Sequence, residues 1–338
     1  MKAFRIGPQT GLDSLIPDTR PDLVPGPGEV IVKVRLVCLN HRDMLVLEGK
    51  YGPRRPEDRT PVSEGMGEVL AIGDGVAGLT VGARVVAPHF VSWIDGDFQR
   101  SAFAHDVGIT HDGWLAEQVR VPAAALVPVP DSLSDMQAAP LASSALTAWN
   151  AVVEVGKVKA GDIVLALGTG GVSIWALQLA KAAGARVAIT SSSDDKLALA
   201  RSLGADITIN YRTTPDWEKA LLDATGGAGA DIIVETGGQA TLAQSIDAAA
   251  TNARIVIIGA LAGKANEGLA NFSTIIGKNL VLTGIAEGSR AMLARLVRAI
   301  ELHGIQPVID REFGFDEALE AYRYLASGSH VGKVLVRL

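Results

Sequence analysis

The chain has 338 residues, of which 31 are Lys or Arg and 37 are Asp or Glu. This length predicts two domains, and the small negative net charge without a basic block argues against binding to nucleic acid or an anionic membrane. The single cysteine, Cys38, excludes an internal disulfide framework and a cysteine-rich structural zinc site. The chain start lacks the apolar core of a secretory signal, and no apolar run reaches membrane-spanning length, so we expect a cytoplasmic protein.

Residues 1–125 have the pattern of a mostly antiparallel β domain. Apolar and polar residues alternate over 29–37, and short β-rich runs follow at 67–72 and 83–87, separated by glycine- and proline-rich turns. Residues 88–113 form a long loop-like segment, which in a compact domain is typically functional. Its aromatic side chains either line an apolar substrate pocket or simply pack the loop down, and the sequence leaves both open.

From residue 126 to 286, strand-like runs alternate with helical segments. This alternation predicts right-handed βαβ crossovers and a doubly wound parallel sheet, an α/β fold. Residues 287–338 continue with a helix at 289–303, another near 316–326 and a strand at 333–337. The strands predicted for the sheet are 163–167, 186–190, 206–209, 231–235, 254–258 and 280–284, and the helices are 171–183, 194–203, 215–224, 239–250 and 270–277.

The segment 163–184 carries the clearest functional motif, namely a buried strand, a cluster of glycines and a helix. Gly168, Gly170 and Ser173 occupy the three positions of a G-x-G-x-x-G motif, of which the third needs only a small residue. Backbone N–H groups and the helix dipole at such a turn favour an anion, most plausibly a dinucleotide pyrophosphate. The turn residues expected to bind it are Gly168, Thr169, Gly170, Gly171 and Val172.

The tip of the second strand favours NADP(H) over NAD(H). An NAD enzyme usually has an acidic side chain at this tip, whereas residues 190–193 all carry hydroxyls and the first acids, Asp194 and Asp195, come later. Hydroxyls and nearby basic side chains suit a 2′-phosphate, although an ordinary solvated surface is the alternative for the basic residues. The residues expected to hold the phosphate are Ser191, Ser192, Lys196, Tyr211 and Arg212.

Several short motifs lie outside the glycine turn: Asn40-His-Arg-Asp43, Ser63-Glu-Gly-Met-Gly67, Gly113-Trp-Leu-Ala-Glu117, Ala139-Pro-Leu-Ala-Ser143, Leu146-Thr-Ala-Trp149 and His330-Val-Gly-Lys333. Together with that turn, they resemble the medium-chain dehydrogenase/reductase superfamily over nearly the whole chain. The resemblance implies a chaperonin-10-like (GroES-like) β catalytic domain at 1–125 and 287–338, and a Rossmann NADP-binding domain at 126–286. It also implies a homodimer formed through the edge strand at 280–284.

Zinc-dependent members of the superfamily bind their catalytic metal with Cys, His and Cys. The matching positions here are Asn40, Ser63 and Ser143, none of which is a good zinc ligand. Cys38 and the histidines of the 88–113 loop could be alternative ligands, but their spacing matches no standard site. We therefore expect no metal, which makes the chain most similar to the zinc-free quinone oxidoreductase-like branch.

Reduction of an activated acceptor is the chemistry that needs least from a metal-free protein. A quinone or enone delocalises the arriving electron pair, so the protein need only orient it and supply hydrogen bonds. The resemblance implies that Asn40 orients the acceptor oxygen and that Tyr51 positions or protonates the substrate. Packing remains the alternative for Tyr51.

Asp43 is expected to anchor the turn at Asn40, and Glu64 either lies near the active site or forms a structural ion pair. Arg42 either meets a charged acceptor group or lies at the surface.

The superfamily also implies residues that pass near the nicotinamide, and Thr147 matches a threonine of this kind. The catalytic candidates are thus Asn40, Tyr51, Asp43 and Thr147, and the further cofactor-binding candidates are Thr147, Gly237, Gly259, Ala260, Leu261, Ile285 and Lys333.

These inferences predict a zinc-independent, NADPH-dependent oxidoreductase that acts on a small apolar carbonyl compound or quinone. An alternative is a medium-chain alcohol dehydrogenase acting on an alcohol and aldehyde pair. A third possibility is a dinucleotide-binding protein with a structural or regulatory role and little turnover.

Overall fold

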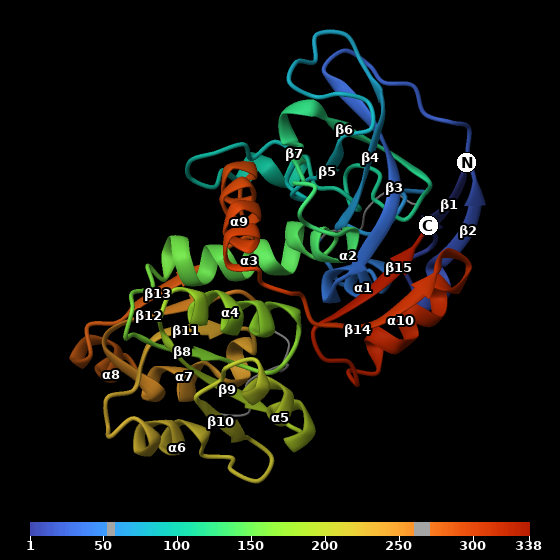
Figure 1. Cartoon of the computed structure of the whole chain (residues 1–338). Coiled ribbons are helices and arrows are strands. Elements are labelled where there is room, and N and C mark those ends of the chain that lie inside the picture. Colours follow the sequence, from blue (N-terminus) through green and yellow to red (C-terminus); the bar gives the residue numbers. More distant parts are fainter. Residues whose placement is uncertain (53–57, 260–270) are drawn as a thin grey trace. The chain divides into compact units, whose positions relative to one another are not determined.

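The structure is a computed structural model that describes residues 1–52, 58–259 and 271–338. Within them the chain forms two compact units (Figure 1). Unit 1 comprises Met1–Leu146 and Gly288–Leu338, and unit 2 comprises Thr147–Glu287. None of the helices in the described ranges is long and apolar enough to cross a membrane.

The first boundary between the units lies at 146/147, later than the expected 125/126. The physical reason is strand pairing, because β7 (Val127–Pro128) pairs antiparallel with β5 (Arg84–Val86). Helix α2 (Asp135–Ala138) also packs on β3 (Glu29–Leu39) and β4 (Gly65–Ile72). The second boundary, 287/288, is one residue from the expected position.

Unit 1 is built on a seven-stranded sheet with the order β14-β15-β3-β4-β5-β7, in which β6 also pairs with β3. β15 pairs antiparallel with β3, so the end of the chain joins the sheet of the N-terminal residues, as expected. Apolar side chains from β3, β4, β6 and α10 form its core. The remaining elements of the unit are β1 (Lys2–Ile6), β2 (Leu15–Thr19), α1 (His41–Leu47), β6 (Gln118–Pro122), α9 (Arg290–His303), β14 (Ile309–Gly314), α10 (Ala318–Ala326) and β15 (Lys333–Arg337).

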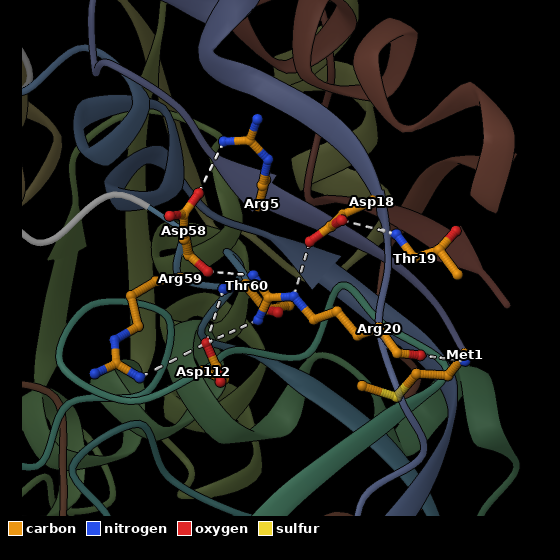
Figure 2. Close-up of polar contacts among 9 residues, drawn as sticks. All are labelled: Met1, Arg5, Asp18, Thr19, Arg20, Asp58, Arg59, Thr60 and Asp112. Atoms are coloured by element: carbon orange, nitrogen blue, oxygen red, sulfur yellow. Dashed lines mark hydrogen bonds and ion pairs between the residues drawn. The ribbon is translucent and has the colours of Figure 1, made fainter.

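An ionic network fastens the β1–β2 ribbon to the rest of unit 1, and Figure 2 shows its members. Arg20 pairs with Asp18 at 2.9 Å and with Asp112 at 3.5 Å, and it also donates to the backbone carbonyl of Asp58. Asp112 accepts a hydrogen bond from the backbone N–H of Thr60 at 3.0 Å. The network therefore joins the ribbon, the segment at 58–60 and the end of the long loop.

Unit 2 contains a six-stranded sheet of order β10-β9-β8-β11-β12-β13, and every pair is parallel. Helix α4 packs on β8 and β9, α5 on β9 and β10, α6 on β10, and α7 on β11 and β12 (Figure 1). The doubly wound α/β fold is thereby confirmed. The elements are β8 (Ile163–Ala166), α4 (Gly171–Ala182), β9 (Arg186–Ser191), α5 (Asp194–Ser202), β10 (Ile207–Asn210), α6 (Trp217–Ala224), β11 (Ala230–Glu235), α7 (Leu242–Ala248), β12 (Ala249–Ile257), α8 (Phe272–Gly277) and β13 (Val281–Gly284), and α3 (Leu146–Trp149) spans the boundary.

Two elements differ from the prediction. Residues 141–155 are helical, although no helix was predicted there, and β12 begins at Ala249 and not at residue 254. The predicted helix at 239–250 accordingly ends at Ala248. Ala249 is buried and pairs with Ala230 before a register shift, so this strand starts with small apolar residues that a helical period also fits. Local propensity alone does not separate the two states here.

The long loop at 88–113 contains one short 3₁₀ helix, Arg100–Ala104. Its aromatic rings pack on one another, since Phe98 lies 5.6 Å from Phe90, 5.0 Å from Trp93 and 5.4 Å from Phe103, measured between ring centroids. These rings therefore pack the loop down, which is one of the two roles that the sequence left open for them.

Candidate functional site

The glycine turn of unit 2 has the geometry of a phosphate-binding turn. Gly168 follows β8 with a φ of +78°, a left-handed conformation that favours glycine. Its N–H donates to Oγ1 of Thr190 at 3.1 Å, which ties the turn to the end of β9. Ser173, in the third motif position, is buried and donates through Oγ to the carbonyl of Leu167 at 2.6 Å. The serine thus replaces glycine with a hydrogen bond that fixes helix to strand.

The N-terminus of α4 suits a bound anion. Its N-cap is Gly170, which supplies no side-chain acceptor, and the first turn contains no acidic residue. By contrast, α5 is capped by the hydroxyl of Ser193 and α9 by that of Ser289. The first N–H groups of α4 have no preceding helical carbonyl to donate to, and a Cβ built on Gly170 meets no protein atom within 4 Å. A dinucleotide pyrophosphate fits this arrangement of donors and open space.

The other expected cofactor residues follow the strands of the same sheet. Gly237 follows β11, Gly259 follows β12 and Ile285 follows β13, so all lie at the carboxyl edge of the parallel sheet. This edge is where open α/β sheets bind ligands. Ala260 and Leu261 lie outside the described residues. Thr147 is a buried residue of α3 and belongs to unit 2, as the glycine turn does.

Glu235 is a residue of this edge that the sequence did not single out. It is fully buried, and its Oε1 accepts from the N–H groups of Gly237 at 2.8 Å and Gly238 at 2.9 Å, and from the Thr241 hydroxyl at 2.6 Å. The carboxylate thereby holds the backbone turn after β11. A lone acid that ends the apolar run Ile232–Val234 was the available signal.

Hydroxyl groups occupy the tip of β9, as the sequence indicated. The Ser191 hydroxyl lies 3.3 Å from that of Thr169, and the Ser191 carbonyl accepts from the N–H of Tyr211 at 3.0 Å. The ends of β9 and β10 are thus adjacent. Ser192 and Lys196 are half-buried beside them, and the side chains of Tyr211 and Arg212 are exposed.

Replacement of Gly170 by alanine is expected to weaken dinucleotide binding by about 30-fold, or about 2 kcal/mol, without loss of stability. The backbone at Gly170 (φ −77°) accepts alanine, and the added methyl group enters the space in front of the α4 N–H groups. Titration with NADPH and thermal unfolding measure the two effects. Gly277→Ala, whose Cβ also meets no protein atom within 4 Å, is the control, and unchanged affinity in Gly170→Ala would contradict the assignment.

A buried polar cluster in unit 1 contains the residues that correspond to the family's metal position. The ammonium group of Lys333 donates to Oδ1 of Asn40 at 2.6 Å and to the carbonyl of Leu39 at 3.0 Å, and it lies 3.3 Å from Oε2 of Glu64. The Lys333 side chain is 4% exposed and the Glu64 side chain 0%. Glu64 also accepts from the N–H of Ser143 at 2.6 Å. Of the two possibilities for Glu64, the structure thus shows the structural ion pair.

Contacts within this cluster bear on two of the expected site residues. The three N–H donors of the Lys333 ammonium have three oxygen partners within unit 1, namely Leu39, Asn40 and Glu64. Asn40 donates its amide N–H groups to Oε2 of Glu64 at 2.9 Å and to the carbonyl of Cys38 at 3.2 Å. Its amide is thus engaged at both ends within the cluster. The roles of Lys333 toward the cofactor and of Asn40 toward the acceptor remain predictions.

The donors around this cluster are poorly suited to zinc. Burial is the main cause that raises the pKa of the Cys38 thiol well above its usual range. The hydroxyl of Ser63 donates to Asp43 at 3.2 Å, and the Lys333 cation contacts Asn40 and Glu64. Across the described ranges, no three His, Cys, Asp or Glu side chains are grouped so that they could hold a metal ion.

The histidines of the long loop form a pair. Nδ1 of His105 lies 3.2 Å from Nε2 of His111, and the rings are stacked with 5.4 Å between centroids. One nitrogen therefore donates to the other. Burial is the main cause that lowers the pKa of His111, and the neighbouring His105 adds to the effect.

Asp43 anchors the turn before α1, as expected. Its Oδ2 accepts from the N–H of Asn40 at 2.8 Å, and its Oδ1 accepts from the N–H of Ser63 at 3.2 Å. Burial raises the pKa of this carboxyl to about 6, in spite of the opposing effect of the nearby Arg42 cation. Asp43 positions the backbone and does not face solvent.

Acidification is expected to increase the stability that Asp43 contributes. Because the folded pKa of about 6 lies above the ordinary 3.8, this contribution is complete below about pH 4 and is lost as pH rises through 6. The loss amounts to about 2 kcal/mol between pH 4 and 8. Urea unfolding of Asp43→Asn at the two pH values should show a pH dependence smaller by this amount, whereas the exposed control Asp316→Asn should match the parent protein. Equal pH dependence in all three would contradict the assignment.

Tyr51 lies beside Arg42, whose side chain is buried and not at the surface. The Arg42 Cζ atom lies 4.8 Å from the centroid of the Tyr51 ring. Nη2 of Arg42 donates to both carboxylate oxygens of Asp106, at 2.7 and 2.8 Å, which links α1 to the long loop. Tyr51 itself is half-buried and packs against the core of unit 1.

Comparison with known proteins agrees with this fold and these sites. Residues 26–131 match the family described as alcohol dehydrogenase GroES-like domain, and residues 171–301 match the family described as zinc-binding dehydrogenase. The chain belongs to the medium-chain dehydrogenase/reductase superfamily and is an oxidoreductase of the kind that binds a nicotinamide dinucleotide.

Three relatives illustrate the range of this superfamily. A zinc-type alcohol dehydrogenase-like protein of Schizosaccharomyces pombe is 41% identical, with 92% of this chain and 91% of the relative covered. An acryloyl-coenzyme A reductase of Sulfurisphaera tokodaii is 28% identical over the whole of both chains. A solved structure of an NAD-dependent alcohol dehydrogenase is 34% identical with a TM-score of 0.91, and both chains are covered completely.

Proposed function

We propose that this protein is an NADPH-dependent oxidoreductase that needs no zinc and transfers a hydride to a quinone or an α,β-unsaturated carbonyl compound. The observation that carries the proposal is the cluster of Lys333, Asn40 and Glu64. A lysine cation contacts both a carboxylate and the amide of Asn40, one of the three residues at the family's ligand positions. The relative named as an acryloyl-coenzyme A reductase, which by its name reduces a conjugated thioester, supports this class of acceptor.

The lysine argues against a second cation in the cluster. At the 3.3 Å between its ammonium and Glu64, the carboxylate charge is already balanced, and a divalent ion would meet a fixed positive charge. The ligand atoms on offer are amide and hydroxyl groups, which zinc binds weakly. An acceptor that is already activated by conjugation needs no such Lewis acid.

The tip of β9 supports NADPH. Ser191 and Ser192 present hydroxyls, and the nearest acid, Asp194, already accepts from the Asn210 amide at 2.8 Å, so it is engaged elsewhere. Lys196 and Arg212 add positive charge suited to a 2′-phosphate. One similar solved structure is named as an NAD-dependent alcohol dehydrogenase, so the preference for NADPH proposed here depends on the tip residues of this chain.

The chain's own residues divide the proposed reaction between them. The N-terminus of α4 holds the pyrophosphate. Thr147 and the residues at the carboxyl edge of the parallel sheet hold the remainder of the dinucleotide. When bound, the dinucleotide supplies the hydride. Tyr51 supplies the proton that completes the reduction, because it carries a dissociable O–H group, whereas the amide of Asn40 does not release a proton.

We also propose that β13 forms the contact of a homodimer. It is the last strand in the sheet order, and its Val281 is 47% exposed. Phe272 and Ile276 on the adjacent α8 are 75% and 79% exposed. An uncovered apolar sheet edge of this kind tends to pair. Sedimentation of the protein before and after Val281→Lys tests the contact.

Steady-state oxidation of NADPH and NADH against quinones, enones, enoyl thioesters and aldehydes tests the proposed function. The protein is first dialysed against chelator and its zinc content measured. Turnover of quinones or enones that is at least about tenfold more efficient with NADPH, and unchanged by added zinc, is expected. Aldehyde reduction that requires zinc would instead favour an alcohol dehydrogenase. Tight dinucleotide binding without turnover across the panel would favour a structural or regulatory protein.

A further inference from the structure

Arg42 is a buried cation that no step of the proposed reaction uses. Its side chain is 9% exposed, and that of its partner Asp106 is 1% exposed. Only Nη2 donates to the carboxylate, and among the described residues Nε and Nη1 have no hydrogen-bond acceptor although both are buried. A structural ion pair of arginine and carboxylate normally uses the guanidinium fork, so this side chain is not placed for that purpose alone.

The remaining face of the guanidinium is directed at Tyr51. The 4.8 Å from Cζ to the ring centroid is within the range of a cation–π contact, which a desolvated arginine strengthens. Tyr51 follows α1 through Gly49, whose φ of +65° reverses the chain so that the ring returns to the helix. Of the three side chains in this group, Tyr51 is the one with an appreciable exposed fraction.

Arg42 stays charged in these surroundings. Burial acts to lower its pKa, but Asp106, Tyr51 and Asp43 together raise it above its ordinary value. A further titratable neighbour of Arg42 is His89 of the long loop, and burial together with the Arg42 cation lowers the pKa of that histidine. Among the described residues, Arg42 is thus a permanent cation in contact with the Tyr51 ring, and Asp106 and Asp43 are its counter-charges.

We infer that Arg42 is a positioning residue for Tyr51: its guanidinium holds the ring and stabilises the negative charge that develops on the phenol oxygen as the proton leaves. This inference rests on the proposed function. In that reaction the Tyr51 O–H bond breaks, and the proton goes to the acceptor, which has received an electron pair with the hydride from NADPH. The phenolate then takes a proton from water.

The pH dependence of kcat tests the inference. In the parent protein, kcat should fall at high pH as the phenol ionises. Arg42→Met is expected to shift this alkaline limb of the pH profile to higher pH by about one unit. It is also expected to lower kcat at neutral pH about tenfold. In a Tyr51→Phe background, Arg42→Met should have little further effect on kcat. A limb that stays in place, or losses that multiply in the double variant, would overturn the inference.

A second variant protects the test against simple destabilisation. Asp106→Asn keeps Arg42 but removes its main counter-charge, so it should move the limb downward, opposite to Arg42→Met. A role limited to packing would lower the melting temperature in both variants and shift the limb in neither. Movement in the same direction for both variants would also contradict the inference.

A readout without turnover separates this inference from the proposed function. The chain has 4 tyrosines, so the ultraviolet difference in phenolate absorbance between the parent protein and Tyr51→Phe isolates the titration of Tyr51. If no acceptor is reduced but this titration still moves in opposite directions in the two variants, the proposed function fails and Arg42 still sets the charge at Tyr51. If acceptors are reduced and the titration does not move, only the inference about Arg42 fails.

Discussion

Replacement of Lys333 by methionine is expected to lower the free energy of unfolding by about 3–5 kcal/mol. The change removes the ammonium that lies 3.3 Å from the fully buried Glu64, together with the donors to Asn40 and Leu39. Methionine has nearly the same length, so the loss is one of charge and hydrogen bonds more than of volume. Urea unfolding at neutral pH measures it.

Two further variants show whether the loss comes from the uncompensated charge of Glu64. Lys2→Met removes a lysine whose side chain is 62% exposed and pairs with Asp316, and it should change stability by less than about 0.5 kcal/mol. The double variant Glu64→Gln with Lys333→Met should recover part of the loss, because no charge then remains buried. A double variant as unstable as the sum of its parts would show that the two groups act independently.

Replacement of Tyr51 by phenylalanine is expected to lower kcat for the best quinone or enone acceptor about 100-fold, with little change in the affinity for NADPH. Removal of a positioned general acid typically costs this much. The ring stays in place to pack against Arg42 and the core of unit 1, so the melting temperature should hold. Steady-state kinetics and NADPH titration separate the two effects.

Tyr324→Phe is the matched control for Tyr51→Phe. Tyr324 of α10 is half-buried like Tyr51, its hydroxyl donates to Asp310 at 2.5 Å, and the loss of this hydroxyl should leave kcat unchanged. Full activity in Tyr51→Phe would return Tyr51 to a packing role and leave the proton to water. Equal losses in both variants would indicate a general effect of removing a tyrosine hydroxyl.

The sequence by itself determined the architecture of unit 2, because that architecture depends on local patterns. Short apolar runs alternating with amphipathic segments predicted the parallel sheet. The glycine cluster at 168–171 also marked the point where strand gives way to helix. The side chains at the ends of successive strands could be assigned to one edge, since parallel strands all end there. Two features were missed: the start of β12 at Ala249, where alanines fit both helix and strand, and the helical segment at 141–155, for which no helix was predicted.

Tertiary structure alone decided the roles of the charged residues in unit 1. Lys333 and Glu64 are separated by most of the chain, and they meet because β15 and β4 both pair with β3. The sequence left a surface position open for Arg42. Only the folded chain shows that its side chain is buried against Asp106 of the long loop. The energy of a buried charge depends on which opposite charge lies within a few ångströms, and that distance is a property of the folded chain and not of any local stretch of sequence.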